Sequence, residues 1–476
     1  MAGDCVLGLD LGTTTCRCIA FDLQGHAIAV ASREAPPEHP APGLAVVHAA
    51  SWWAAVRQVL GAMAGQLADL GARPVGLGLS GLQHAMVPLD GEGQVLAPSM
   101  LWMDQRSRAQ VEWLNGEGRS SLEAALGPGA RASNTPSLPK LRWLSEHQPE
   151  LLAHTQVLLL PKDYVRYRLT GHIGTDPSDA GGTMLYDARS GDWAPGLLEL
   201  AGVGREQMPP IYPSDALAGK ITPEAATQTG LPAGLPVAVG AGDTMATILG
   251  SGGEHTGRAF IYIGTAAWVR RPGPRDRTRF LATATTGAAV RWLRDLLAGA
   301  GDRVTYDEMM ADAAQAPPGS EGLLFLPHLC GERGPVPDPD ARGLLAGLSM
   351  RHGRGHLVRA VLEGTCCHLR WLLDDGATVA PDAIWVAGGA VHSAVWMQML
   401  AEVLGRPVHT PRVAEAGALG AAILAAVGVG LYADRERALA AMVHPGPVYR
   451  PDPARTDAYE DVYMRWRELE ACWMGH

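Results

Sequence analysis

The 476-residue sequence has little of what marks a nucleic-acid-binding protein. It holds no long basic run, and its 39 Lys and Arg residues stand against 49 Asp and Glu residues, which gives a formal charge of −10. Proteins that bind nucleic acid neutralise phosphates with clustered cations. Nucleic acid is therefore not expected among the partners.

Cysteines are few and poorly placed for disulfide bonds. There are seven, an odd number; Cys366 and Cys367 are adjacent, and Cys16 and Cys18 are too close in sequence for an ordinary bridge. A disulfide framework is therefore not expected. A reducing cytoplasm is the expected compartment.

A secretory signal is not expected either, because the first residues carry Asp4 and Asp10 and no basic stretch. One uncharged run, 416–433, has the minimum length of a membrane span. It is mostly Ala and Gly, which is more typical of a tightly packed buried helix. Membrane association is not expected.

Glycine and proline, by contrast, are abundant: 58 and 35 residues, with no triplet period. This composition indicates many turns and close backbone approaches. Because single hydrophobic cores stop growing at roughly 250–300 residues, the length predicts at least two domains.

The hydrophobic pattern at the start predicts a β-meander, then a helix and a strand. Strands are expected over 5–11 and 17–22 around a Gly-Thr-Thr-Thr turn, and a third strand follows a Gln-Gly turn. Ser51 is expected to cap a helix that runs to Leu70, and a strand over 75–80 comes next.

The second half repeats this opening pattern. A hydrophobic strand, a Gly-Thr turn and a second strand recur over 260–269. A helix over 287–298, a strand over 384–387 and a helix over 393–404 follow. We therefore predict an α/β protein made of two related halves.

The boundary between the halves is expected in the glycine-rich stretch 250–257, where the first pattern ends. This divides the chain into domains 1–249 and 250–476.

The first Gly-Thr turn can bind a phosphate. Asp10 ends a buried strand and is followed by Gly12, Thr13 and Thr14, whose N–H groups and hydroxyls suit a phosphate, while Asp10 can hold a metal ion through water. An ordinary hairpin turn is the alternative. The second copy, at Gly264 and Thr265, favours phosphate binding.

Gly388 and Gly389, between a strand and a helix, either let a ligand approach the backbone or make a tight connection.

Together these residues resemble the FGGY carbohydrate kinase family, and within it the xylulokinases, over nearly the whole chain. The matching segments are 101–106, 137–147, 158–171, 175–184, 343–348 and 356–363. The resemblance implies two actin-like, ribonuclease-H-like ATPase domains of sugar-kinase type with an interdomain cleft. The N-terminal domain would bind the sugar and the C-terminal domain the nucleotide.

The resemblance also implies residue roles. Asp243 aligns with the catalytic acid that accepts the proton of a sugar hydroxyl, and its place at a helix N-terminus predicts an ionised carboxylate at neutral pH. The implied sugar-binding residues are Gln83, His84, Trp102, Asp104, Arg106, Asp243 and Thr244. The implied ATP contacts are Thr13, Thr14, Gly264, Thr265, Gly388 and Gly389, with Asp10 at Mg²⁺.

Several of these residues also suit structural roles: His84 at a strand end, Trp102 in a core and Asp243 as a helix cap. Gly331-Glu332-Arg333 resembles a family loop near the cleft, and an exposed Glu-Arg pair is the alternative.

The implied activity is ATP-dependent phosphorylation of a ketose, D-xylulose to D-xylulose 5-phosphate, with only sugar and ATP as partners. Thr244 and Met103 stand where xylulokinases usually carry Asn, and the interval 270–286 looks shortened by a strand pair. Two alternatives for the function therefore stay open: a kinase of ribulose or a polyol, and a catalytically silent nucleotide-binding regulator. For the assembly, a homodimer stays open.

Overall fold

The computed structural model describes residues 3–127, 129–253, 259–272, 278–298, 304–338, 340–375, 381–413 and 415–475. The chain forms two compact units. The first contains the chain up to Gly250 together with Gly417–Val443, and the second contains Ser251–Ala416 with His444–His476. The sequence placed 417–443 in the second domain, whereas the structure places this segment in the first unit. Residues 254–257 of the expected boundary lie outside the described residues.

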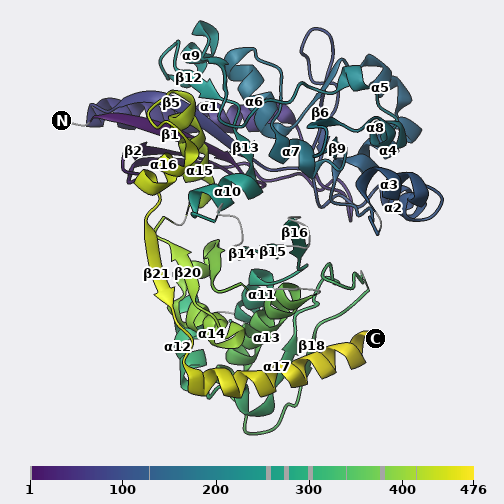
Figure 1. The fold of residues 1–476 in the computed structure, drawn as a ribbon, viewed down its shortest axis with the longest axis vertical. Helices are drawn as coiled ribbons and strands as arrows, with labels where there is room; N and C mark the ends of the chain where they lie inside the picture. The colour runs from purple at the N-terminus through teal and green to yellow at the C-terminus, as the bar shows by residue number, and fades with distance from the viewer. Residues whose placement is uncertain are drawn as a thin grey trace. The chain divides into compact units, whose positions relative to one another are not determined.

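The first unit is built on a seven-stranded sheet (Figure 1) with the order β11-β12-β5-β1-β2-β3, and β13 beside β5. Its strands are β1 Asp4–Leu11, β2 Thr15–Asp22, β3 Ala27–Glu34, β5 Arg73–Gly81, β11 Leu217–Lys220, β12 Pro236–Ala238 and β13 Ala241–Gly242. β1, β2 and β3 form the predicted antiparallel meander. β5 runs parallel to β1, and β12 and β13 run parallel to β5.

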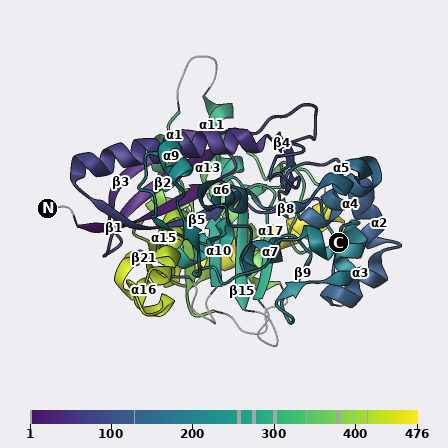
Figure 2. The same cartoon turned by 90° about the horizontal axis from the view of Figure 1, so that it is seen from above.

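Helix α1, Ala49–Leu70, covers one face of this sheet and lies along β2 and β3 (Figure 2). It begins two residues before the predicted cap: His48 is the N-cap residue, and Ser51 lies inside the first turn. The odd-numbered residues of β1 belong to the same apolar core as α1, because successive side chains of a strand point to opposite faces.

Helix α15, Ala416–Gly428, lies on the opposite face, beside strands that are far away in sequence (Figure 1). A Cβ on Gly8 or Gly78 would come within 1.8 Å of the backbone oxygen of Ala418 or Ala421. Only glycine at these two strand positions lets the helix lie directly on the sheet. Among the described residues, no helix has the length and apolar character needed to cross a membrane.

A helical layer with its own apolar core is inserted between β5 and β12. Its helices are α2 Arg108–Asn115, α3 Arg119–Leu126, α4 Ser137–His147, α5 Pro149–His154, α7 Pro177–Gly182 and α8 Pro195–Ala201. Helix α6, Pro161–Thr170, instead contributes to the core under α1.

Short elements complete the first unit. They are β4 Val46–Val47, β6 Val87–Leu89, β7 Ser99–Met100, β8 Val157–Leu159, β9 Tyr186–Asp187, β10 Asp192–Trp193, η1 Arg205–Gln207, α9 Pro223–Thr229, α10 Asp243–Gly250 and α16 Arg435–Met442.

The second unit contains a six-stranded sheet with the order β16-β15-β14-β19-β20-β21. Its strands are β14 Ala259–Ile263, β15 Ala267–Pro272, β16 Thr278–Ala282, β19 Ile384–Ala387, β20 Val408–Pro411 and β21 Pro445–Tyr449. An antiparallel meander is followed by two parallel strands and an antiparallel edge strand, as in the first unit. The prediction of two related halves is therefore confirmed. The interval 270–286, which looked shortened, contains the end of β15 and the whole of β16, and its residues 273–277 lie outside the described part.

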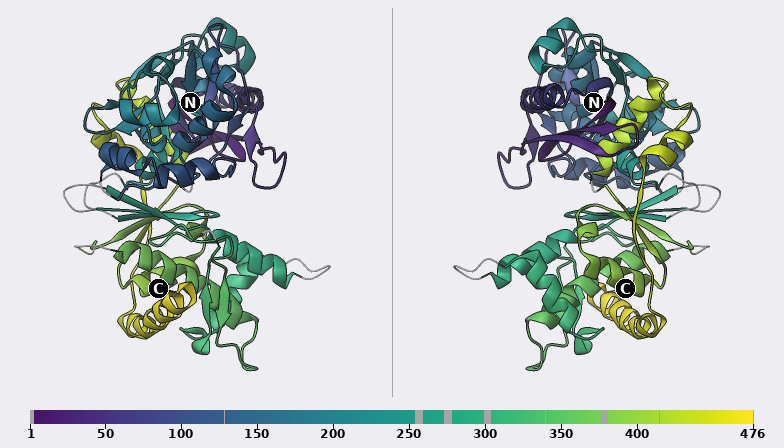
Figure 3. Two further views of the ribbon diagram at one scale, coloured as in Figure 1. Left: turned by 90° about the vertical axis from the view of Figure 1, so that its right-hand side faces the viewer. Right: turned by 90° about the vertical axis from the view of Figure 1, so that its left-hand side faces the viewer.

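The helices of the second unit, green to yellow in Figure 3, gather on one face of its sheet. They are α11 Gly287–Leu297, α12 Tyr306–Gln315, α13 Arg354–Asp374, α14 Ala394–Leu404 and α17 Pro453–Met474, with the short elements η3 Ser320–Gly322, β17 Leu324–Leu326, β18 Leu344–Ala346 and η4 Gly389–His392. These helices and the sheet share one apolar core. All seven cysteines of the chain are free thiols.

Candidate active site

Polar residues stand where three neighbouring strands of the first unit end. In the register of the sheet, Asp10 of β1 pairs with Ser80 of β5, and Ser80 pairs with Ala241 of β13. Even-numbered positions of β1 and β5 face α15, so Asp10 and Ser80 point to the same side. The Ser80 hydroxyl donates a hydrogen bond of 2.7 Å to Asp10 Oδ1. Asp243 follows β13 directly as the first residue of α10.

The carboxyl group of Asp243 has a strongly shifted acidity. Desolvation by the surrounding protein, and then repulsion from the Asp10 carboxyl, raise its pKa from 3.8 to about 7. The backbone N–H and the hydroxyl of Thr244 donate to Asp243 Oδ1 and oppose this shift. The sequence predicted an ionised carboxylate from the helix N-terminus alone. The structure corrects this, because the carboxyl group is buried and a second carboxyl, that of Asp10, lies close by.

Gln83 and His84 follow β5 and bind the 176–184 segment. Gln83 Nε2 donates to the backbone oxygen of Ser178 at 2.8 Å, and His84 Nδ1 lies 2.6 Å from the backbone oxygen of Gly182. His84 has a positive φ of 71°, a strained backbone conformation for a residue with a side chain. A Cβ on Gly242 would lie 2.5 Å from Gln83 Nε2, so Gln83 packs directly against the residue before Asp243.

The structure brings Trp102 to the first Gly-Thr turn. Its indole Nε1 donates to the hydroxyl of Thr13 at 3.3 Å. Thr13 is half-buried, and Thr14 is exposed at the tip of the turn. A residue predicted for the sugar and one predicted for phosphate are therefore in direct contact.

Asp104 is fully buried, and its two carboxylate oxygens are both engaged. Arg106 donates to each oxygen at 2.8 Å, and the backbone N–H of Ala45 donates to Oδ2 at 2.8 Å. Burial alone would raise the pKa of Asp104, but these hydrogen bonds hold it below its usual value. Asp104 was predicted to bond sugar hydroxyls. Its hydrogen bonds instead suit a role in which Asp104 holds Arg106 in position. The Arg106 side chain stays 20% exposed.

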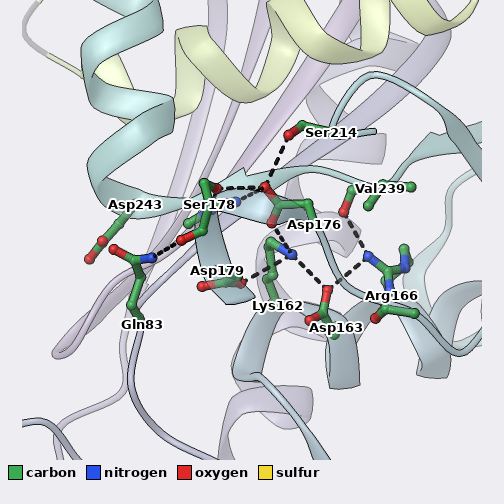
Figure 4. A network of polar contacts seen from close by, with 12 residues as sticks. Gln83, Lys162, Asp163, Arg166, Asp176, Ser178, Asp179, Ser214, Val239 and Asp243 are labelled. Atoms are coloured by element: carbon green, nitrogen blue, oxygen red, sulfur yellow. Dashed lines mark hydrogen bonds and ion pairs between the residues drawn. The ribbon is translucent and has the colours of Figure 1, made fainter. Parts of the chain in front are cut away.

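A chain of hydrogen bonds, which the sequence did not reveal, lies behind Asp243 (Figure 4). The backbone N–H of Gly242 donates to Ser178 Oγ at 2.9 Å, and Ser178 Oγ donates to Asp176 Oδ2 at 2.6 Å. Ser214 Oγ donates to the same Asp176 oxygen at 3.0 Å. In the sequence, segment 175–184 stands out only by its family resemblance. That resemblance is the signal that could have indicated the positioning role of Ser178 and Asp176.

Asp176 in turn belongs to a buried cluster of charges in which Lys162 is central. Lys162 Nζ lies 2.7 Å from Asp163, 3.0 Å from Asp176 and 3.1 Å from Asp179, and all four side chains are fully buried (Figure 4). Arg166 adds a second cation at 2.8 Å from Asp163.

Burial, together with the charges of Asp163 and Asp176, raises the pKa of Asp179 well above its usual value. This shift favours the protonated form of Asp179, in which two carboxylates balance the cations Lys162 and Arg166. A neutral cluster costs less to bury than a charged one.

The predicted nucleotide contacts of the second unit meet at the ends of two parallel strands. Tyr262 of β14 pairs with Ala387 of β19, so Gly264 and Gly388 follow neighbouring strands. Gly388 has φ 98°, and a Cβ there would lie 2.4 Å from the backbone oxygen of Ile263. A Cβ on Gly389, by contrast, would point into open space, with no such neighbour within 4 Å.

Backbone contacts fix the second Gly-Thr turn. The oxygen of Thr265 accepts hydrogen bonds from the N–H groups of Thr286 and Ala288, at the start of α11. The Thr265 side chain itself is exposed. The structure thus places four of the predicted nucleotide contacts in the second unit. The remaining predicted site residues all lie in the first unit.

A cavity of 280 Å³ in the first unit contains His84 and Arg106 in its lining, but neither Gln83 nor Asp243. Its walls are mostly apolar, with Met86, Met100 and several prolines and leucines among them. A sugar needs hydrogen-bonding partners for its hydroxyls. We therefore assign no sugar to this cavity.

Two residues of the family signatures have internal partners. Lys140 Nζ donates to the backbone oxygens of residues 134–136 at the start of α4. Glu363 accepts hydrogen bonds from Gly319, Arg359 and Tyr459 within the core of the second unit. Both therefore stabilise the fold around the site.

Comparison with known proteins gives full-length matches. The FGGY family of carbohydrate kinases matches with its N-terminal domain over residues 5–250 and with its C-terminal domain over residues 272–429. The xylulose kinase of Escherichia coli K12 is 31% identical over 97% of this chain and 98% of its own length. The crystal structure of xylulose kinase from Rhodospirillum rubrum has a TM-score of 0.87 at 33% identity, covering 98% of both chains. The structure of gluconate kinase from Lactobacillus acidophilus has a TM-score of 0.89 at 25% identity, also covering 98% of both chains.

Proposed function

The chain belongs to the FGGY family of carbohydrate kinases and is an ATP-using sugar phosphotransferase, and we propose that its substrate is a ketose, D-xylulose, phosphorylated on its terminal hydroxyl. The xylulose kinases among its relatives support this substrate. The observation that carries the proposal is Asp243, a carboxyl group with a pKa of about 7 at the end of β13.

In the proposed reaction the terminal hydroxyl of the ketose attacks the γ-phosphorus of ATP, and the bond from that phosphorus to the bridging oxygen of ADP breaks. Asp243 accepts the proton of the hydroxyl. Phosphoryl transfer passes through a loose transition state, so the proton needs to leave only late, and most of the catalysis comes from positioning and charge neutralisation. A base with a pKa near the operating pH suits this proton transfer.

Gln83, His84, Trp102 and Arg106 are proposed to bind the sugar. Gln83 and His84 are held by the 176–184 segment, and Arg106 is held by Asp104. Trp102 offers a ring face to the C–H side of a sugar, while its N–H is bonded to Thr13. Each of these side chains has at least one partner that fixes its direction, which lowers the entropy cost of binding.

Mg²⁺ bound with ATP is proposed to be held at Asp10. The residues fit this ion: Asp10 Oδ1 accepts the Ser80 hydroxyl, and Oδ2 lies 3.1 Å from the position that a Cβ on Gly417 would fill. Glycine therefore keeps space beside a carboxylate oxygen, the ligand type that Mg²⁺ prefers. When bound, the ion would neutralise phosphate charge.

The ATP contacts are proposed at Thr13 and Thr14 in the first unit, and at Gly264, Thr265, Gly388 and Gly389 in the second. Exposed Thr14, Thr265 and Gly389 are available to a ligand. Backbone N–H groups at such glycine-rich turns suit phosphate oxygens. The free thiols of the chain favour the cytoplasm as the site of the reaction.

A second candidate substrate is another ketose or a polyol. Thr244 supports it, because its hydroxyl is already directed at Asp243 Oδ1 at 3.3 Å and offers no amide to a sugar hydroxyl. Sites that bond a hydroxyl discriminate strongly through such groups. Met103 packs against the apolar core and bears less on this choice.

The test is ADP release measured with purified enzyme and Mg-ATP over a panel of ketoses, aldonates and polyols. The proposal predicts the highest kcat/KM for D-xylulose. A higher kcat/KM for ribulose or for a polyol would favour the second candidate. Absence of ADP release with every sugar would overturn the proposed activity.

A further inference from the structure

The second unit contains a buried cluster of two histidines and one glutamate. His328 and Glu332 lie on the loop that follows β17, and His368 lies in the middle of α13. The side chains of His328 and Glu332 have no exposed surface, and that of His368 is 1% exposed. The exposed Glu-Arg pair considered for the Gly331-Glu332-Arg333 loop is therefore wrong for Glu332.

The three side chains converge on one point. Glu332 Oε2 lies 2.5 Å from His328 Nδ1 and 3.0 Å from His368 Nε2, and one ligand atom from each residue lies within 4.8 Å of the others. Two ligand atoms bound at about 2.0–2.1 Å to a tetrahedral ion lie about 3.3 Å apart. Movements of well under 1 Å would bring both observed distances to that value.

Hydrogen bonding does not account for this arrangement. Within the described residues, none of the four ring nitrogens of His328 and His368 has a hydrogen-bond partner of acceptable geometry, and neither has Glu332 Oε2. The other oxygen, Glu332 Oε1, accepts the backbone N–H groups of Arg333 and Gly334 and is thereby fixed. These atoms lie in close contact without a hydrogen bond of acceptable geometry, and buried polar atoms that form no hydrogen bond are costly. Their convergence therefore points to a ligand that binds all three.

The surroundings are buried and aromatic. His368 stacks near Trp371 and Trp466, with ring centroids 5.9 Å and 6.0 Å away, and the His328 ring lies edge-on at 5.3 Å. A low-dielectric shell strengthens the bond between a cation and a carboxylate.

We propose that His328, Glu332 and His368 bind a divalent transition-metal ion of the Zn²⁺ type. Two imidazoles and one carboxylate are a common ligand set of Zn²⁺, whereas Mg²⁺ prefers oxygen ligands only. This site is thus distinct in chemistry from the one proposed at Asp10. The ion connects the loop carrying Gly331–Arg333 to α13, and its role is to hold that loop in place.

The test uses the full-length chain without an affinity tag, freed of metal by a chelator and then desalted. Co²⁺ is added as a spectroscopic probe, because a four- or five-coordinate Co²⁺ ion absorbs visible light strongly. Zn²⁺ content is measured separately by mass spectrometry after equilibrium dialysis. We expect one tightly bound ion per chain with either metal, and a higher unfolding midpoint with Zn²⁺ than without it.

Variants locate the ion. His328→Gln and His368→Gln each remove one ligand and keep a polar side chain, and each is expected to abolish the stoichiometric Co²⁺ signal. The control is the double substitution of His352 and His356, a partly exposed pair with ring centroids 5.5 Å apart, by Gln. This control is expected to retain the full signal, because it leaves His328, Glu332 and His368 unchanged.

If a variant fails to fold, a measurement on the wild-type protein alone still tests the proposed metal site. X-ray absorption of the Zn²⁺-loaded chain is expected to show two imidazole ligands and oxygen in the first coordination sphere. Absence of stoichiometric binding to the wild type, a spectrum without two imidazoles, or loss of the Co²⁺ signal only in the surface control would overturn the proposal. None of these readouts depends on kinase activity.

Discussion

Ser178 Oγ accepts the backbone N–H of Gly242 at 2.9 Å, one residue before Asp243. The same hydroxyl donates to Asp176, so it connects a buried charge cluster to the turn between β13 and α10. This turn sets the position of the proposed base.

Replacement of Ser178 by Ala is therefore expected to lower kcat by about 10- to 100-fold, because small displacements of a catalytic group have effects of this size. KM for the sugar is expected to change less. Steady-state kinetics with D-xylulose measures both values.

Ser214→Ala is the matched control for this substitution. Ser214 is buried, whereas Ser178 is half-buried, and Ser214 likewise donates to Asp176 Oδ2, at 3.0 Å, but has no hydrogen bond to Gly242. Equal losses of kcat in both variants would show that the effect comes from Asp176 and not from the turn.

The pKa of Asp243 predicts the pH dependence of the reaction. The base must be ionised to accept a proton, and its pKa is raised from 3.8 to about 7. Below pH 7 the protonated, inactive form dominates, so kcat/KM should fall about tenfold per pH unit and level off above pH 7. Direct detection of ADP between about pH 5 and 9 checks this. A profile that stays flat down to about pH 5 would contradict the shifted pKa.

Lys162 is expected to matter for stability. Lys162→Met leaves buried carboxylates without their cation, and removing one partner of a buried ion pair typically costs about 3–5 kcal/mol. Urea unfolding measures the loss. Arg73→Met, at an exposed ion pair with Asp4, is the control and should change the unfolding midpoint little. Similar midpoints for the two variants would contradict the importance of the buried cluster.

Alanine substitutions at two adjacent glycines distinguish a structural role from a nucleotide-binding role. Gly388→Ala places a Cβ 2.4 Å from the Ile263 oxygen at a positive φ and should destabilise the protein by at least about 2 kcal/mol. Gly389→Ala meets no protein atom within 4 Å and should leave stability unchanged. If nucleotide approaches this turn closely, Gly389→Ala raises KM for ATP. Unchanged KM for ATP would remove Gly389 from the proposed contacts.

The sequence predicted much of the sheet framework, because period-two strands and Gly-Thr turns are local patterns. The meander, the strand that carries Ser80 and the recurrence of both in the second half are confirmed. The place of 417–443 was missed, because it depends on α15 packing against Gly8 and Gly78, which are distant in sequence. Local pattern contains no information on such contacts.

The roles of the site residues stay predictions, whereas the acidity of Asp243 differs from the sequence-based expectation. The sequence predicts both Asp10 and Asp243 as site residues. The burial of Asp243 and its repulsion from Asp10 arise only where three strands end side by side, so its raised pKa could not be predicted from local pattern. Asp104 was named as a sugar ligand because carboxylates suit hydroxyls. Its full burial and the hydrogen bond from the backbone N–H of Ala45 arise only in the folded chain.

The most direct test compares D-xylulose-dependent ADP formation by the wild type and by Asp243→Asn. General bases contribute about 10²- to 10⁴-fold to rates, so the variant should lose at least about 100-fold in kcat. Calorimetry should show that it still binds D-xylulose. A wild type inactive with D-xylulose, or an Asn variant as fast as the wild type, would contradict the assignment of Asp243 as the base of a ketose kinase.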